Sequence, residues 1–268
     1  MKDVTFGQYY PSHSVVHKLN PAIKILLAIC YIVGVFLVSG ENYFLGFLLC
    51  TAFVVVCVII SRVPVLLVLK SMKAIIFFVI LSALLQIFFN KQGTPLWENG
   101  FITDKALLAS GFITLRIILV VFGASVLTLT TSPVEIADGI EVLLAPLKLI
   151  KFPVHEFALI MSIALRFIPT LLEETDRIIK AQQARGAEFE GGIIKKAKAL
   201  IPVLIPLLIG SFRRADELAD AMDSRCYSGS KNRTKYKKMT LSLGDLMAFL
   251  LVGGLVAGVV LLNGVFII

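Results

Sequence analysis

The sequence has few charged residues. Asp, Glu, Lys and Arg make up 16% of its 268 residues, while 57% of the residues are apolar. A typical soluble domain has about 25% charged residues. The mean hydropathy of +0.89 points in the same direction. This composition excludes an ordinary soluble domain and favours a protein whose natural solvent is a lipid bilayer.

Several chemical signatures are also missing. The four cysteines form no C-x-x-C pair, and the three histidines lack the spacing of a metal site. No G-x-x-x-x-G-K-[ST] loop is present, so we expect no ATP site and no cofactor on this chain. H-E-x-x-H and G-x-S-x-G are absent as well, and no paired carboxylates lie inside an apolar span. We therefore expect neither a metal centre nor the catalytic site of an intramembrane enzyme.

Apolar runs of membrane length are what the sequence does contain. A span needs about 20 apolar residues. The runs predict an all-α polytopic membrane protein with about five membrane helices, four of them in residues 21–132 and one in residues 241–268. The polar residues 1–20 have no signal-peptide layout, so we expect insertion to rely on the first membrane helix. The five runs are Ala22–Val38, Tyr43–Ile60, Ala74–Phe89, Leu107–Leu129 and Leu246–Ile268.

Basic residues predict the orientation. Seventeen Lys and Arg residues lie between Thr131 and Gly244, whereas the Ser39–Asn42 turn has none. Because basic loops stay in the cytoplasm, we expect the N-terminus and the long polar segment to be inside the cell membrane and the C-terminus to be outside. The net charge of +8 then reflects topology and anionic lipid rather than nucleic acid. The basic stretch Lys231–Lys238 is expected to face lipid headgroups.

Residues 133–240 are too polar for ordinary spans and too apolar for a loop. They predict a cytoplasmic or interfacial domain of three helices: Val134–Ile150, Pro153–Gly186 and about Ile193–Arg225. The second and third helices each begin apolar and end charged. Five residues are candidate hinges, because an internal proline removes a backbone hydrogen bond and adjacent glycines break a helix. These hinge candidates are Pro169, Gly191, Gly192, Pro202 and Pro206.

The charged halves of the two long helices resemble each other. Residues 173–186 align with residues 213–226 at a constant offset of 40, and Arg185 then coincides with Arg225. Each arginine has small neighbours on the last turn of its helix. A guanidinium at such a narrow tip can pair with a carboxylate of a partner protein. The alternative is that each arginine only favours the helix dipole, by about 0.3–1 kcal/mol.

At this point the chain resembles a known family, the transmembrane coupling subunits (T components) of energy-coupling factor transporters. The similarity begins with an opening motif, in which the family usually has Asp where this chain has Asn20. The opening motif consists of Gly7-Gln8-Tyr9, Pro11, Ser14, His17, Leu19-Asn20-Pro21 and Lys24. Further matches are Thr130-Thr131-Ser132-Pro133 with Asp138-Gly139-Ile140, Leu165–Pro169 followed by Glu173-Glu174, and two Ala-Arg-Gly signatures. The first signature stands here as Ala184-Arg185-Gly186. The second stands as Ser224-Arg225-Cys226, where only the arginine is kept.

The resemblance implies a function. Members are non-catalytic subunits of ATP-driven importers of vitamins and transition metals in prokaryotes, which places this chain in a prokaryotic cell membrane. Each signature arginine would dock in a groove on one of two homologous cytoplasmic ABC ATPases. The apolar halves of the long helices would contact a separate substrate-binding membrane subunit, the S component. ATP hydrolysis would take place on the partner ATPases.

A self-sufficient secondary transporter or channel is the alternative function. Such proteins often carry ionisable residues inside their spans. Arg116 is the only charge well inside a strong apolar run, where it could bind an anion, pair with a backbone carbonyl or snorkel to the membrane surface. No acidic residue lies in such a run to act as a proton relay. Five spans also do not divide into two inverted repeats.

Overall fold

The computed structural model describes residues 9–12, 14–39, 43–73, 75–89, 103–187, 192–229 and 241–264. The regular elements within these ranges are helices, which confirms the predicted all-α fold. The chain divides into two compact units. The bundle unit comprises Gly7–Gly139 and Met239–Ile268, and the long-helix unit comprises Met1–Phe6 and Ile140–Lys238.

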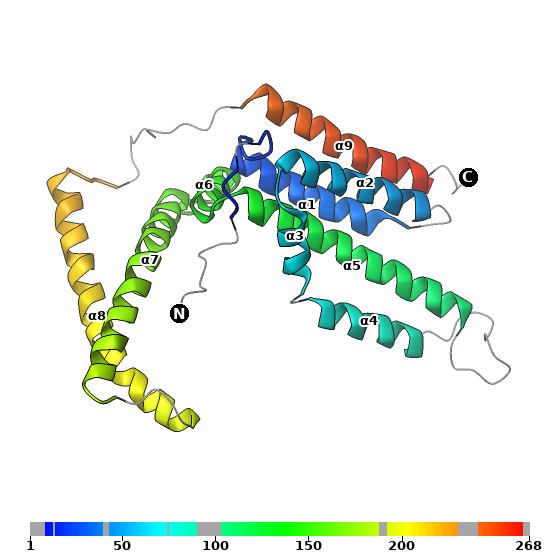
Figure 1. The fold of residues 1–268 in the computed structure, drawn as a ribbon. Coiled ribbons are helices and arrows are strands. Elements are labelled where there is room, and N and C mark those ends of the chain that lie inside the picture. Colours follow the sequence, from blue (N-terminus) through cyan, green and yellow to red (C-terminus); the bar gives the residue numbers. More distant parts are fainter. Residues whose placement is uncertain are drawn as a thin grey trace. The chain divides into compact units, whose positions relative to one another are not determined.

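The bundle unit is built from apolar helices. In Figure 1, α1, α2, α5 and α9 run side by side, and α4 lies along α5. All five predicted apolar runs are found here as helices that begin and end within a few residues of the runs. The helices are α1 (Pro21–Leu37), α2 (Tyr43–Ser61), α3 (Val65–Met72), α4 (Ile76–Phe89), α5 (Asp104–Thr130) and α9 (Leu243–Gly264).

Local capping explains where two of these helices begin. Before α1, the Asn20 side chain accepts a hydrogen bond from the backbone N–H of Ala22 at 3.0 Å, and Pro21 occupies the first helical position. Before α5, the Thr103 hydroxyl accepts a hydrogen bond from the N–H of Ala106 at 3.3 Å. Both caps satisfy N–H groups that a helix start leaves free.

The core of the bundle unit consists of small and β-branched side chains with a few aromatic rings. Tyr31 stacks on Phe53 with ring centroids 5.6 Å apart. Many large apolar side chains on the outer faces are exposed, among them Phe36 and Phe44. Helices that are apolar on the outside as well as the inside are those that a bilayer covers. Buried core residues include Val35, Val38, Cys50, Leu119, Leu129 and Val259.

Four described helices are long and apolar enough to cross a membrane, judged by length and composition. They are α2, α5, α7 (Val154–Ala184) and the Leu243–Asn263 part of α9. The apolar helices α1 and α4 are shorter. The prediction of about five membrane helices counted α1 and α4 and left out α7. Its apolar first half qualifies α7 even though its second half is charged.

The segment that follows α5 corrects one prediction. Val134–Ile150 was expected to be one helix, but α6 (Pro133–Leu143) ends before Ala145, and a 3₁₀ helix, η1 (Ala145–Ile150), follows. Pro146 explains the break, because a proline has no N–H to donate and its ring clashes with the carbonyl four residues earlier. Lys151 then reverses the chain in a left-handed conformation, with φ of 61°.

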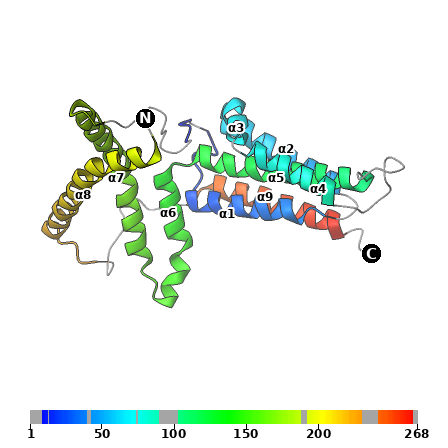
Figure 2. The same ribbon diagram turned by 90° about the horizontal axis from the view of Figure 1, so that it is seen from below.

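The long-helix unit contains the end of α6, η1 and the two long helices α7 and α8 (Ile193–Ser224). Both long helices end within two residues of their predicted ends. Figures 1 and 2 show α7 and α8 packed against one another from two directions. The eight-residue α3 in the bundle unit was not predicted, since two helical turns between Arg62 and Lys73 leave too short a periodic pattern.

Candidate functional site: two helix tips and a crossing

The first signature forms the C-terminal end of α7. Ala184 is its last helical residue and Arg185 its C-cap. The N–H of Gly186 donates to the carbonyl of Gln183 at 3.0 Å, and the N–H of Ala187 donates to the carbonyl of Gln182 at 3.0 Å. These two bonds define a Schellman motif, which needs a left-handed residue just after the cap. Gly186 takes that position with φ of 85°.

The second signature ends α8 with the same bonds. Ser224 is the last helical residue and Arg225 the C-cap. The N–H of Cys226 donates to the carbonyl of Asp223 at 2.8 Å, and that of Tyr227 donates to the carbonyl of Met222 at 3.0 Å. Cys226 is left-handed with φ of 57°. A side chain there costs about 1–2 kcal/mol that glycine avoids.

The two tips are therefore one structure repeated. Every donor and acceptor of the first Schellman motif maps onto the second at the offset of 40 that relates the two sequences. Arg185 and Arg225 are both exposed. The residue immediately before each arginine and the residue immediately after it are exposed as well. Each tip thus presents one exposed cation between small neighbours. Two of the backbone carbonyls that each helix end leaves free are bonded within the tip.

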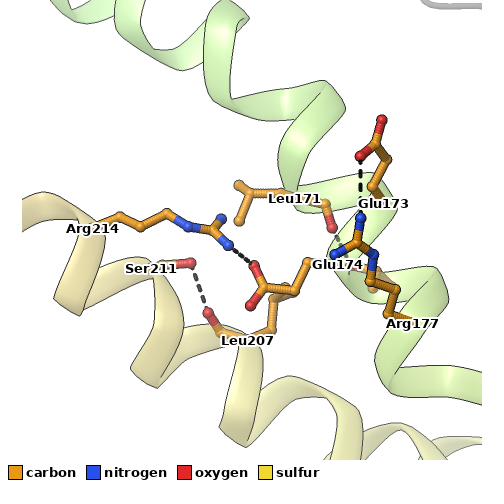
Figure 3. Close-up of polar contacts among 8 residues, drawn as sticks. Leu171, Glu173, Glu174, Arg177, Leu207, Ser211 and Arg214 are labelled. Carbon is orange, nitrogen blue, oxygen red and sulfur yellow. Dashed lines mark hydrogen bonds and ion pairs between the residues drawn. The ribbon is translucent and has the colours of Figure 1, made fainter. Parts of the chain in front are cut away.

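Between the tips and the apolar halves, α7 and α8 cross, and Figure 3 shows the contact. An ion pair joins the guanidinium Nη2 of Arg214 on α8 to the carboxylate Oε2 of Glu174 on α7. The side chains are 28% and 27% exposed. Gly210, one turn before Arg214, brings the α8 backbone close, because a Cβ there would lie 3.1 Å from the Glu174 carboxylate. Glu174 belongs to the Glu173-Glu174 stretch that carries part of the family resemblance, but its pairing with Arg214 was not predicted from the sequence.

A second ion pair near the crossing lies within one helix. Glu173 and Arg177 of α7 are four residues apart, with Oε2 and Nη2 separated by 3.9 Å, and their side chains are 74% and 82% exposed. Figure 3 shows this pair beside the crossing. An exposed pair at this spacing contributes little to stability, about 0.3–0.5 kcal/mol.

The hinge candidates lie inside or beside the long helices. Pro169 is internal to α7, and Pro202 and Pro206 are internal to α8, yet both helices continue past them. Each proline leaves the carbonyl four residues earlier without its helical donor. Gly192 precedes α8 as its N-cap in an extended conformation. Gly191 lies outside the residues that the structure describes.

The apolar half of α8 is exposed. Its large exposed side chains recur at the spacing of one broad helix face, and Val203 is the one fully buried apolar side chain among the described residues of α8. An exposed apolar surface of this length marks an interaction site on a protein or a membrane. The exposed residues are Leu200, Ile201, Leu204, Ile205, Leu208, Ile209 and Phe212.

In the bundle unit, residues of the opening motif form a polar cluster. Lys24 is 5% exposed, and its Nζ donates to the backbone carbonyls of His17 at 3.0 Å and Thr130 at 3.1 Å. Asp245, at the start of α9 and 2% exposed, accepts hydrogen bonds from the N–H groups of Asn20 and Ser242, each at 2.8 Å. The opening motif therefore has a structural role, because its residues connect the start of α1 to the start of α9 and to the end of α5.

Two further motif segments also have local roles. Ser132 and Glu135 form a capping box at the start of α6, with reciprocal side chain to backbone bonds of 3.3 and 3.1 Å. Gly139 lets α6 approach α1 closely, because a Cβ there would lie 3.0 Å from the backbone N of Ala22.

Arg116 is engaged within the bundle unit. Its Nη2 donates to the carbonyl of Val38 at 2.6 Å, just past the end of α1. Its guanidinium carbon lies 5.9 and 5.6 Å from the ring centroids of Phe36 and Phe47. Pairing with a backbone carbonyl was one of the three roles considered for Arg116. Within the ranges that the structure describes, no group of three or more His, Cys, Asp or Glu side chains could hold a metal ion.

Comparison with known proteins agrees with the resemblance in the sequence. A family model described as "Cobalt transport protein" (CbiQ) matches residues 12–236. The energy-coupling factor transporter transmembrane protein EcfT of Ruminiclostridium cellulolyticum is 48% identical over 250 residues, covering 92% of each chain. The protein of that name from Clostridium kluyveri is 46% identical over 254 residues, covering 93% of each. That from Bacillus subtilis is 43% identical over 242 residues, covering 89% of this chain and 90% of its own.

Proposed function

This chain belongs to the CbiQ family and to the transmembrane components of energy-coupling factor transporters, and we propose that it is the non-catalytic coupling subunit of such an importer. In this role it links two homologous cytoplasmic ABC ATPases to a substrate-binding membrane subunit, for uptake of a vitamin or a metal ion. ATP binding and hydrolysis take place on the ATPases.

The duplicated tip is the observation that carries the proposal. Two identical Schellman ends each present one exposed arginine, Arg185 and Arg225, at equivalent positions. Two equivalent tips suit two homologous partners, one for each tip. Each guanidinium can pair bidentately with a carboxylate in a groove of its ATPase. The small neighbours, Ala184 and Gly186 at one tip and Ser224 at the other, permit close approach. Cys226 adds a side chain on the second tip.

The exposed apolar face of α8 supports contact with the substrate-binding subunit. The face extends from Leu200 to Phe212 and precedes the Arg225 tip on the same helix. A helix that meets one partner with its apolar half and another with its charged tip can pass motion between them. Pro202 and Pro206 lie in the apolar half, where they are candidate pivots.

The proposed topology follows from charge. The basic segment between Thr131 and Gly244 is cytoplasmic with the N-terminus, and the C-terminus is outside. Both arginine tips then lie on the side of the membrane where ATP is available. Lys231–Lys238, which lies outside the residues that the structure describes, is proposed to face lipid headgroups. Arg116 does not favour the alternative of a self-sufficient transporter, since its Nη2 already bonds the carbonyl of Val38.

Co-purification tests the proposal. The chain is co-expressed with the ATPase pair and substrate-binding subunits of its own organism, and the wild type is compared with Arg185→Ala/Arg225→Ala. The control is Arg177→Ala/Arg213→Ala, which removes the same charge from exposed positions on the same helices. We expect stoichiometric ATPases with the wild type and the control, and their loss from the tip variant. Purification of the wild type without ATPases would overturn the proposal.

A further inference from the structure

The crossing of α7 and α8 joins equivalent residues of the repeat. Glu174 and Arg214 are 40 residues apart, the same offset that relates the two arginine tips. Each lies 11 residues before its tip, because 185 − 174 and 225 − 214 both equal 11. At 1.5 Å per residue, each tip is about 16 Å along its helix from the ion pair. The two tips are therefore equidistant from the crossing.

The contact at the crossing is close and local. Gly210 has no side chain to separate the helices, since a Cβ would lie 3.1 Å from the Glu174 carboxylate. Among the residues that the structure describes, Glu174–Arg214 is the only ion pair that joins α7 to α8. The two charges are about three-quarters buried, so water screens them less than the exposed Glu173–Arg177 pair.

The ion pair also leaves room for rotation. Arg214 bonds Glu174 through Nη2 alone, and its Nη1 is buried without a hydrogen-bond partner in the described part of the chain. An open surface hollow of about 420 Å³ adjoins the pair, lined by α7 residues between Thr170 and Ala181 and by Arg214. A bidentate arginine would fix the angle between two helices, because two parallel bonds specify a plane. A single bond beside an open hollow holds one point and lets the angle change.

We propose that the Glu174–Arg214 pair is the fulcrum of the two long helices: it fixes the point at which they cross, so that the crossing angle sets the separation of the Arg185 and Arg225 tips. This inference rests on the proposed function. Movement of the ATPases at the tips then becomes rotation about the ion pair and displaces the apolar halves on its far side. Glu174 and Arg214 are positioning residues, which act through the tips and touch neither ATP nor substrate.

The test measures the distance between the tips in the assembled complex. Spin labels are placed at Gln183→Cys and Asp223→Cys, equivalent exposed positions, in a chain whose four native cysteines are replaced by serine. Pulsed electron paramagnetic resonance gives the distance distribution without nucleotide and with ATP. The test variants are Glu174→Gln, Arg214→Gln and the exchange Glu174→Arg/Arg214→Glu. The matched control is Glu173→Gln/Arg177→Gln, which removes the exposed pair beside the crossing.

We expect a narrow distribution that shifts with ATP in the cysteine-replaced reference chain and in the control. Glu174→Gln and Arg214→Gln should broaden the distribution and lose the shift while the ATPases still co-purify, and the charge exchange should restore both features. Retention of the narrow distribution and the shift in either single variant would overturn the fulcrum, as would equal broadening in the control. If the unsubstituted chain retains no ATPases, the proposed function fails, and the fulcrum's role in coupling fails with it.

Discussion

The left-handed residue that follows each tip arginine leads to two predictions of opposite sign for the stability of the helix ends. Gly186 has φ of 85° and Cys226 has φ of 57° at equivalent positions, so the same conformation is held by glycine on α7 and by a residue with a Cβ on α8. Cys226→Gly should stabilise the end of α8, and Gly186→Ala should destabilise the end of α7. A Cβ at Gly186 would meet no atom within 4 Å, so any effect arises from the backbone conformation.

The magnitude follows from two opposing effects. A Cβ in the left-handed region costs about 1–2 kcal/mol. Glycine in its place costs about 0.5–1 kcal/mol of additional entropy, because the unfolded chain is freer. The net change is about 1 kcal/mol in each direction, which corresponds to about fivefold in a local opening equilibrium.

Amide hydrogen exchange in the detergent-solubilised chain measures this opening. The N–H groups of residues 185–187 and 225–227 hold the two Schellman motifs closed. Cys226→Gly should slow exchange in the peptide over 222–227, and Gly186→Ala should accelerate it over 182–187, each by about fivefold. Ser224→Ala, in the right-handed last turn, is the control. Unchanged exchange in Gly186→Ala would refute the Schellman end at the first tip.

Three further predictions concern the bundle unit, and thermal unfolding in detergent measures all of them. Asp245→Ala should lower the free energy of unfolding by about 1–3 kcal/mol, because the N–H of Asn20 loses its acceptor, the buried Asp245 carboxylate. An unchanged stability would mean that another acceptor replaces the carboxylate. Gly123→Val should lower the free energy of unfolding by about 1–3 kcal/mol or more, since a Cβ would lie 2.5 Å from the Tyr31 ring. Gly111→Ala is the control, because a Cβ at Gly111 would meet no atom within 4 Å. Arg116→Met should lower stability but leave ATPase co-purification intact, and loss of the ATPases would contradict its structural role.

Much of the helical structure could be predicted from local patterns. The apolar runs located α1, α2, α4, α5 and α9, and the two long amphipathic stretches located α7 and α8 within two residues. Two errors arose where local signals compete. Pro146 ended α6 early and started η1 inside a pattern that remained amphipathic, and α3 was too short for its periodicity to stand out.

The candidate site was predictable in part. Both arginines could be found as helix ends followed by a change in composition, and the repeat marked them as equivalent. The Schellman bonds themselves depend on residues within six positions of one another. The repeat also aligned Glu174 with Arg214, but nothing in the alignment said that equivalent residues touch. Asp245 was missed because its partner, Asn20, lies 225 residues away in the sequence.

The sequence by itself determined that this is a protein of the lipid bilayer, where most of its helices lie, and where the two arginine tips are. Each of these depends on composition or on residues within one or two helical turns of one another. Only the tertiary structure decided which charges meet. Lys24 bonds the end of α5, Arg116 the end of α1, and Glu174 bonds Arg214 at the crossing. These contacts depend on where packed helices approach and which way side chains point, and helical periodicity does not specify either of these.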